Sequence, residues 1–313
     1  MAMRAVEVEE LTQSGLTGPS IPEMEQELRE IVYLGPEGTF SEEACLAYLR
    51  AVPDNSGLVM GRDYPTIPEV IAAAAADPSC LAIVPLENSS EGSVTVTLDI
   101  LAAAGDKLKI CGEVILPVHH HLLGLPGTGI GDVEEVLSHP QALSQCQKQL
   151  GTNLPGVRQI ATASTAEAAR LVAKDRRMNS TAIGTLQAAL RYGLEVLVPE
   201  IQDCNGNCTR FILLGHTLCS PTGNDKTSLV FTTADKPGAL YKILGVLANR
   251  GINLTKIESR PTGKRLGEYL FHLDLEGHCQ DKIVVEALES MRFLTSWMQV
   301  LGSYPKAGRS ILP

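Results

Sequence analysis

The chain has 313 residues, of which 44% are hydrophobic, and a formal net charge of −10. Its length gives room for two ordinary domains with apolar cores, and its composition excludes an intrinsically disordered protein. Lys and Arg form no cluster, and phosphate binding needs clustered cations, so we expect no nucleic-acid partner. A small-molecule partner fits this chain better.

The apolar stretches and the cysteines indicate where the protein resides. Residues 70–76 and 114–118 are among the longest apolar runs and are far shorter than the roughly 20 residues that span a bilayer. The N-terminus lacks the basic and apolar regions of a signal peptide, so we expect a cytoplasmic protein and no membrane partner. Cys204 and Cys208 lie near His216, but a closed zinc site needs four ligands, so we expect no metal.

Residues 1–29 show no compact apolar pattern and are expected to form an N-terminal extension outside the fold. From residue 31 onward, strand-like runs such as "IVYLG", "CLAIVPLE", "EEVLSHP", "TAIGT", "EVLVPEIQD" and "RFILLG" alternate with helix-like segments. Helices are expected over residues 41–51, 67–76, 140–151 and 165–175. This alternation predicts α/β architecture with parallel sheets that are covered by helices.

Capping residues mark the beginnings of several predicted helices. Ser41, Thr66 and the pair Ser164–Thr165 each stand just before acidic residues, a pattern typical of helix N-termini. Such helix ends also attract anionic ligands.

The pattern changes after residues 216–226, where Pro221, Gly223 and Asn224 predict a linker. Residues 227–305 then read as strand, turn, helix, strand, loop, strand and a final helix at about residues 281–288. This βαββα-like order predicts a small ferredoxin-like α+β domain. Such a module is too small for the main chemistry and suits regulation.

Two segments place polar side chains where predicted strands end. "GPEGTFSEEA" (35–44) carries Thr39 and Ser41, and "IVPLENSSEGS" (83–93) brings Glu87 and Asn88 to the end of an apolar strand. Open α/β sheets bind ligands beyond the carboxyl ends of their strands. The alternative is structural: a plain turn in the first segment, and an Asx-type turn with Glu87 in solvent in the second.

Two later segments repeat this plan. "LSHPQALSQC" (137–146) carries Ser138, His139 and Gln141, and "ATASTAEAA" (161–169) carries Ser164 and Thr165. His139 suits proton transfer because its ordinary pKa is near neutrality. Helix capping alone explains both segments equally well.

The segment "GNCTRFILLGH" (206–216) places Thr209 and Arg210 at the start of an apolar run. "LPVHHHLLG" (116–124) predicts partly buried strand histidines and no metal site, because alternate strand residues face opposite sides. Nucleophile-elbow, Walker and dinucleotide motifs are absent from the sequence. The remaining hydroxyls, amides, arginine and carboxylate predict binding of an anionic organic acid, with catalysis by hydrogen bonding.

Taken in order, these motifs resemble the prephenate dehydratase family of the monofunctional type with a C-terminal ACT regulatory domain. The resemblance runs from about residue 31 to 305 and rests on "GPEGTFSEEA", "VPLENSSEGSV", "LPVHHHLLG", "SHPQALSQC", "STAEAA", "NCTRF", "PGALYKIL", "NLTKIESRP" and "VLGSYP". It implies decarboxylating dehydration of prephenate to phenylpyruvate in L-phenylalanine biosynthesis, without metal or redox cofactor.

The resemblance also implies a domain arrangement. A catalytic domain over residues 30–215 would have two α/β lobes like those of a periplasmic binding protein, with the active site in the cleft between them. We expect one lobe from about residues 30–105 together with 195–215, and the other from residues 106–194. The linker is 216–226, and the ACT domain is 227–305.

The family's catalytic threonine falls on Thr209, and Glu87 and Asn88 are expected to orient the leaving hydroxyl. Arg210 is expected to clamp a substrate carboxylate, with bracing of the cleft as the alternative. The family match places further residues around the same cleft: Thr39, Ser41, Ser138, His139, Gln141, Ser164, Thr165, Asn207 and Phe211.

Two motifs in the C-terminal domain match the family's signatures for binding L-phenylalanine as an allosteric effector. They are Pro237, Gly238, Ala239 and Leu240 ("PGAL") and Glu258, Ser259, Arg260 and Pro261 ("ESRP"). Tyr241 departs from the valine that many relatives have there. Effector binding between paired ACT domains implies a homodimer or a homotetramer.

Arogenate dehydratase, which shares these signatures, is the alternative enzyme, and a non-catalytic amino-acid sensor is an alternative of another class. A fusion to chorismate mutase is disfavoured because the leader is too short for that helical domain.

Overall fold

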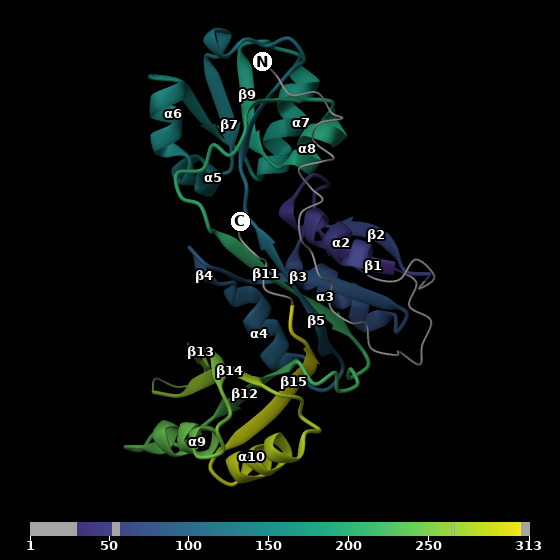
Figure 1. Cartoon of the computed structure of the whole chain (residues 1–313), viewed down its shortest axis with the longest axis vertical. Coiled ribbons are helices and arrows are strands. Elements are labelled where there is room, and N and C mark those ends of the chain that lie inside the picture. The colour runs from purple at the N-terminus through teal and green to yellow at the C-terminus, as the bar shows by residue number, and fades with distance from the viewer. Residues whose placement is uncertain (1–29, 52–56, 264, 266, 308–313) are drawn as a thin grey trace.

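The computed structural model describes residues 30–51, 57–263, 265 and 267–307, and the predicted extension over residues 1–29 lies outside them. Two mixed α/β sheets and one antiparallel sheet make up the described fold. Figure 1 shows them in line along the long axis, with the sheet that contains β1, β3 and β11 in the middle. None of the described helices is long and apolar enough to cross a membrane.

The first lobe has the strand order β2-β1-β3-β11-β5, with β4 beside β3. Strands β1 and β3 are parallel, and β11 runs antiparallel to both β3 and β5. Apolar residues such as Ile31, Leu81 and Ile212 are fully buried in its core. Its elements are β1 (Glu30–Leu34), α2 (Phe40–Ala51), β2 (Val59–Tyr64), α3 (Ile67–Ala76), β3 (Cys80–Asn88), β4 (Gly92–Ser93), α4 (Thr95–Ala103), β5 (Lys109–Pro117) and β11 (Cys208–Gly215).

The second lobe has the strand order β10-β6-β9-β7-β8, in which β7, β8 and β9 are parallel. Its elements are β6 (His121–Gly124), the 3₁₀ turn η2 (Ile130–Asp132), β7 (Glu135–Ser138), α5 (Pro140–Gln145), α6 (Gln147–Asn153), β8 (Arg158–Ala161), α7 (Thr165–Asp175), β9 (Ser180–Gly184), α8 (Leu186–Tyr192) and β10 (Glu195–Val198). The chain passes between the lobes twice, from β5 to β6 and from β10 back to β11. The two-lobed architecture is therefore confirmed.

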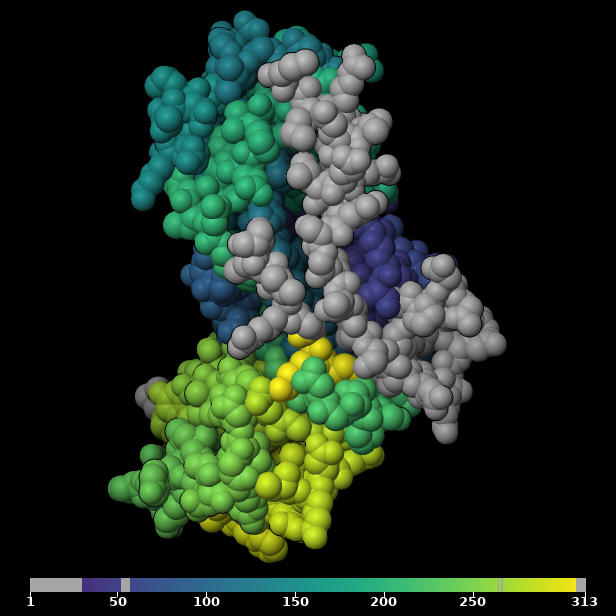
Figure 2. All heavy atoms as spheres, in the orientation of Figure 1, coloured from purple at the N-terminus to yellow at the C-terminus, as the bar shows by residue number. Residues whose placement is uncertain are grey.

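The C-terminal domain has the strand order β13-β14-β12-β15, and all its strand pairs are antiparallel. Its elements are β12 (Asp225–Thr232), α9 (Ala239–Ala248), β13 (Leu254–Pro261), β14 (Tyr269–Glu276), α10 (Lys282–Arg292) and β15 (Trp297–Pro305). The α+β class is confirmed, but the predicted order missed the last strand. Figure 2 shows this domain, in yellow-green, at one end of the molecule.

The predicted lobe boundaries are wrong at two strands. Residues 109–117 were expected in the second lobe, but β5 pairs with β11 in the first. Residues 195–198 were expected in the first lobe, but β10 pairs with β6 in the second. Both pairings join strands that are distant in sequence, and a local apolar pattern does not specify such partners.

Helix starts follow their capping residues. Thr66 accepts a hydrogen bond from Glu69 N, and Ser164 accepts one from Glu167 N, as predicted. The cap predicted at Ser41 is wrong, because α2 begins at Phe40 and Glu42 N donates to Thr39 Oγ1 over 3.4 Å. The single helix predicted over residues 140–151 is two helices, α5 and α6, which meet at Cys146.

Candidate active site

The carboxyl ends of the parallel strands in the two lobes face each other. Thr185, which follows β9, donates a hydrogen bond to the carbonyl of Gly38, which follows β1, over 3.0 Å. A Cβ atom on Gly38 would lie 3.2 Å from Ala188, and the φ of Gly38 is +87°, so a glycine suits this close approach. A second contact joins Gln145 Nε2 to Glu91 Oε1 over 3.4 Å. The loops that follow these strands therefore meet between the lobes, where open α/β sheets bind ligands.

Thr209 and Asn88 lie side by side near this meeting point, on paired strands β11 and β3. Asn88 Nδ2 donates a hydrogen bond to Thr209 Oγ1 over 2.9 Å. Asn88 Oδ1 accepts from the backbone amides of Ser90 and Glu91, which fixes the orientation of the Asn88 amide group. Because Thr209 Oγ1 accepts this bond, its own O–H proton is left to be donated elsewhere.

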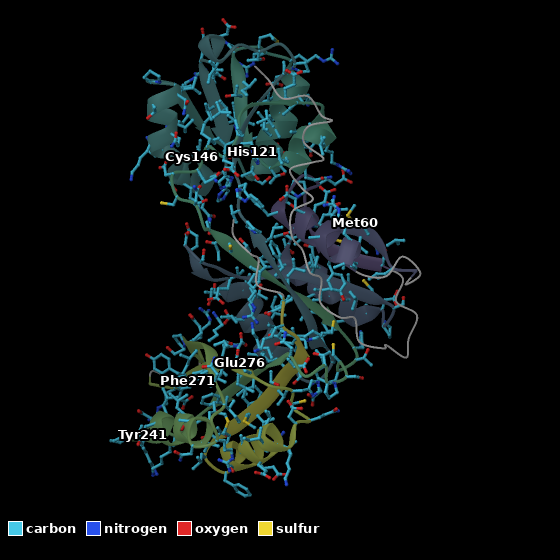
Figure 3. The ribbon with its side chains drawn as sticks, in the orientation of Figure 1. Met60, His121, Cys146, Tyr241, Phe271 and Glu276 are labelled. Atoms are coloured by element: carbon cyan, nitrogen blue, oxygen red, sulfur yellow. The ribbon has the colours of Figure 1, made fainter. Side chains whose placement is uncertain are left out.

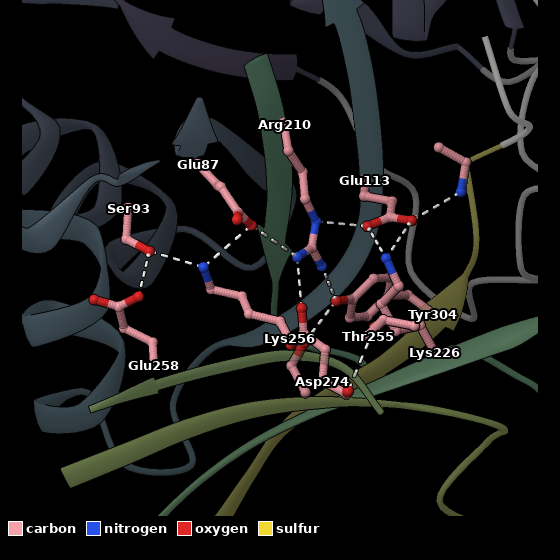
Figure 4. A network of polar contacts seen from close by, with 12 residues as sticks. Glu87, Ser93, Glu113, Arg210, Lys226, Thr255, Lys256, Glu258, Asp274 and Tyr304 are labelled. Atoms are coloured by element: carbon pink, nitrogen blue, oxygen red, sulfur yellow. Dashed lines mark hydrogen bonds and ion pairs between the residues drawn. The ribbon is translucent and has the colours of Figure 1, made fainter. Parts of the chain in front are cut away.

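The neighbouring residues Glu87 and Arg210 face the opposite side of the sheet, because strand side chains alternate. Lys256 of the C-terminal domain lies 3.1 Å from Glu87 Oε2, and Arg210 Nη1 lies 3.9 Å from the same oxygen (Figure 4). The prediction that Glu87 acts beside Thr209 is therefore contradicted by this geometry. The alternation of side chains along a strand could have shown this from the sequence, because it places Glu87 opposite to Asn88 and Arg210 opposite to Thr209.

The Arg210 guanidinium is bound within the protein. Its Nε donates to Glu113 of β5 over 2.7 Å, its Nη1 to Asp274 of β14 over 2.5 Å, and its Nη2 to Tyr304 of β15 over 2.7 Å (Figure 4). The side chain is 10% exposed. A clamp on a substrate carboxylate is contradicted, because Glu113, Asp274 and Tyr304 already hold all three guanidinium nitrogens.

Burial and charge act in opposite directions on the groups of this cluster. Burial alone lowers the pKa of Arg210, but Tyr304, Asp274 and Glu113 more than offset that effect and raise the pKa well above its ordinary value. Burial likewise raises the pKa of the Asp274 carboxyl, whereas Arg210 and Ser228 lower it by more. Arg210 and Asp274 are therefore charged together.

Lys226 completes the charge balance around Glu113. Its Nζ lies 2.9 Å from Glu113 Oε2, and the Glu113 side chain is only 1% exposed. Glu113, Asp274 and Tyr304 were not identified from the sequence. Local patterns gave no signal for them, because the contacts join residues at least 64 positions apart.

The predicted residues of the second lobe gather at its carboxyl edge, where Ser138 pairs with Ala161 across β7 and β8. Ser138 is fully buried and donates to the carbonyl of Ile183, so it is a structural residue. His139 accepts from the backbone amide of Gln141 and caps α5. Ser164 caps α7, and Thr165 is the first residue of that helix.

The predicted residues of the first lobe have mainly structural contacts. Thr39 donates to the carbonyl of Leu34, and Ser41 is buried. Phe211 is a core residue that is 2% exposed, so its predicted role in substrate binding is contradicted. Asn207 Oδ1 accepts from Ser89, and Ser89 in turn accepts from the amide of Cys208. Ser89 thus holds the turn just before Thr209, and it was not predicted from the sequence.

The three consecutive histidines lie where the chain passes between the lobes. His119 and His120 fall between β5 and β6, so the predicted continuous strand is interrupted, and His121 begins β6. His120 is buried and packs edge-on against Phe40. Burial lowers the pKa of His121 to about 4, so this imidazole is neutral at pH 7. Figure 3 shows His121 within the second lobe.

The two predicted effector motifs lie in the C-terminal domain. Pro237 and Gly238 precede α9, which begins with Ala239 and Leu240, and no side chain caps that helix. On β13, Glu258 Oε2 accepts a hydrogen bond from Ser93, and Arg260 forms two 2.7 Å bonds with Asp99. The side chains of Glu258 and Arg260 therefore face the catalytic domain, whereas Ser259 and Pro261 are exposed.

Comparisons with known proteins agree with this arrangement. Residues 31–218 match the family model described as prephenate dehydratase, and residues 227–293 match the ACT domain. The prephenate dehydratase of Methanocaldococcus jannaschii is 40% identical over 281 residues, which cover 88% of this chain and 98% of that protein.

Two solved structures are similar over most of their length. One is prephenate dehydratase in complex with L-Phe from Arthrobacter aurescens, with a TM-score of 0.78 and 36% identity over 88% of this chain and 90% of that chain. The other is described as GqqA, a novel type of quorum quenching acylases, with a TM-score of 0.79 and 33% identity over 89% of this chain and 98% of that chain.

Proposed function

The chain belongs to the prephenate dehydratase family, and we propose that its reaction takes place around Thr209, between the two lobes. The enzyme is a hydro-lyase with a C-terminal ACT regulatory domain. It converts prephenate to phenylpyruvate in phenylalanine biosynthesis, and L-phenylalanine regulates it through the ACT domain. The observation that carries the site proposal is the hydrogen bond from Asn88 to Thr209.

The chemistry requires two bonds of the substrate ring to break. The C–C bond to the ring carboxylate breaks to release CO2, its electron pair enters the ring, and the C–O bond to the ring hydroxyl breaks as that group departs. Aromatisation drives both steps, so the enzyme needs chiefly to stabilise the departing hydroxyl. A positioned hydrogen-bond donor stabilises such a leaving group by roughly 3 kcal/mol.

Thr209 is suited to be this donor. Its oxygen accepts from the Asn88 amide, which polarises the hydroxyl and directs its proton away from Asn88. The N-terminus of α7, with Ser164 and Thr165, would attract a substrate carboxylate from the second lobe. Gln141 and His139, at the start of α5, would border the same ligand.

An acylase reaction, as the description of GqqA names it, is less well supported by this site. A nucleophilic hydroxyl needs a base that accepts its proton. Thr209 receives a hydrogen bond from a donor instead.

L-phenylalanine would bind in the ACT domain at the N-terminus of α9. Gly238 has a φ of +78°, and α9 has no side-chain cap, so its first amides suit the effector carboxylate. Ser259 and Pro261 would line the exposed side of the same site, while Glu258 and Arg260 transmit binding to the catalytic lobe. Tyr241, 79% exposed on α9 and directed away from the lobes in Figure 3, would lie between paired ACT domains of a homodimer.

We also infer a cytoplasmic location. All eight cysteines are free thiols, and a reducing compartment keeps thiols in that state.

Turnover of prephenate and of arogenate, each with and without L-phenylalanine, tests the function. Phenylpyruvate is followed by its absorbance in alkali, and phenylalanine by chromatography. We expect phenylpyruvate formation that L-phenylalanine suppresses. Preference for arogenate would identify the protein as an arogenate dehydratase instead. If neither substrate is turned over, a non-catalytic amino-acid sensor would be the remaining interpretation.

Thr209→Val tests the site. Loss of the hydroxyl should lower kcat by about a hundredfold or more, because one transition-state donor is removed. Thr209→Ser keeps the hydroxyl and is the matched control, which should retain most of the activity. Near-normal turnover by the valine variant would exclude Thr209 as the donor.

A further inference from the structure

Arg210, the residue next to Thr209, joins strand β11 to the ACT domain. Two of its three hydrogen-bond partners, Asp274 on β14 and Tyr304 on β15, belong to that domain, and the third, Glu113, belongs to β5 of the catalytic lobe. Thr209 therefore lies on one face of strand β11, and Arg210, which the ACT domain holds, lies on the opposite face. Figure 4 shows the guanidinium between the strands of the two domains.

The backbone ladder between β11 and β3 is irregular at this residue, whereas the ladder between β11 and β5 is regular there. Arg210 pairs with Glu87, but Phe211 pairs with Pro85, so Leu86 is an extra residue on β3. Proline has no N–H to donate, and a bulge interrupts the ladder and changes the direction of nearby side chains. On the β3 side of β11, the direction of the side chains at Thr209 and Arg210 therefore depends on side-chain contacts as well as on the ladder.

The contacts of Arg210 are buried, and its partners have further hydrogen bonds. Ser228 Oγ donates to Asp274 Oδ1 over 2.5 Å and lies 2.6 Å from Tyr304 Oη, so both ACT partners of Arg210 are themselves held. Asp274 and Tyr304 are 4% and 0% exposed. Charge-assisted hydrogen bonds in such a setting have narrow geometry, and removing one partner leaves the other without compensation.

We propose that Arg210 is a positioning residue through which Asp274 and Tyr304 of the ACT domain hold β11 and thereby set the direction of the Thr209 hydroxyl. This proposal rests on the role of Thr209 in the proposed function. It gives Asp274 and Tyr304 a role in positioning Thr209, although neither belongs to the catalytic domain.

Tyr304→Phe is the decisive variant, because it removes the hydroxyl that accepts from Arg210 and keeps the aromatic ring. Displacement of Thr209 should lower kcat about tenfold while KM for prephenate stays within about twofold. Arg210→Lys keeps the charge but loses the forked geometry, and should lower kcat at least as much. The double variant should lose no more activity than Arg210→Lys alone, because both changes break the same contact.

Glu276→Gln is the matched control, since it breaks the ion pair between Glu276 on β14 and Lys306, which directly follows β15. Its kcat should equal that of the wild type. The methyl NMR signal of Thr209 provides a second readout that needs no turnover, and it should shift in Tyr304→Phe and stay in place in Glu276→Gln. Melting curves establish that each variant is folded.

Two results would overturn the proposal. One is wild-type kcat together with an unmoved Thr209 signal in Tyr304→Phe. The other is an increased KM in Arg210→Lys while Tyr304→Phe behaves as the wild type, which would mean that Arg210 contacts substrate. Failure of the proposed function would have a different result: the wild type would not turn over prephenate, or Thr209→Val would keep near-normal turnover. The Thr209 NMR signal in Tyr304→Phe would still show whether Tyr304 positions Thr209.

Discussion

At the scale of single residues, Asn88 determines which way the Thr209 hydroxyl donates. Asn88→Asp replaces the Nδ2 donor with a carboxylate oxygen, which would accept the Thr209 proton and turn it away from substrate. We expect kcat to fall by about a hundredfold, with a smaller change in KM. Steady-state kinetics with prephenate measure both values.

The same variant has a built-in structural control. Asn88 Oδ1 accepts from the amides of Ser90 and Glu91, and an aspartate oxygen can accept the same two bonds. The turn should therefore keep its shape, and the melting temperature should change little. Wild-type kcat in Asn88→Asp would mean that the Asn88 amide does not orient Thr209.

Residue types at the site were easier to predict than residue directions. Thr209 and Asn88 were identified from the sequence, and the structure brings them together. Glu87 and Arg210 were expected in the same site as their sequence neighbours Asn88 and Thr209, yet adjacent strand residues face opposite sides. Their partner Asp274 is 64 residues from Arg210, and no local pattern indicates such a contact.

At the scale of elements, Gly302 allows β15 of the ACT domain to lie against β5 of the catalytic lobe. A Cβ atom at this position would lie 2.1 Å from the carbonyl oxygen of Ile110, a backbone atom that cannot rotate away. Gly302→Ala should force the strands apart and cost about 2 kcal/mol of unfolding free energy. Denaturant unfolding measures the loss, and limited proteolysis detects undocking of the domain.

Gly245→Ala makes the same chemical change with the opposite expected sign. Gly245 lies within α9, and an added Cβ there would meet no atom within 4 Å. Alanine should stabilise this helix by about 0.5 to 1 kcal/mol. Equal stability of the two variants would contradict the tight contact between β15 and β5.

Elements with strong local signals were predicted well, and their pairing was not. Helices α3 and α7 have the bounds that were expected from apolar periodicity and capping. Strands β5 and β10 were assigned to the wrong lobes, because the choice of sheet depends on partners far along the chain. The last strand, β15, was missed although its "VLGSYP" segment had been recognised as part of the family pattern.

At the scale of the whole molecule, two buried histidines in separate domains link folding to pH. Burial lowers the pKa of His121 in the second lobe and of His272 in the ACT domain to about 4, from an ordinary value of 6.5. Between these values the unfolded chain binds protons that the folded protein does not. The stability from neutral burial is therefore complete above about pH 6.5 and is lost as the pH falls towards 4.

Each histidine should contribute roughly 3 kcal/mol to this loss. Urea unfolding at pH 7.5 and at pH 4.5 measures it, and His272→Phe separates it from the titration of carboxylates. Among the described residues, neither ring nitrogen of His272 has a hydrogen-bond partner, so phenylalanine removes the titration without breaking a bond. The variant should lose less stability than the wild type between the two pH values, and an equal loss in both proteins would show that His272 is not titrating.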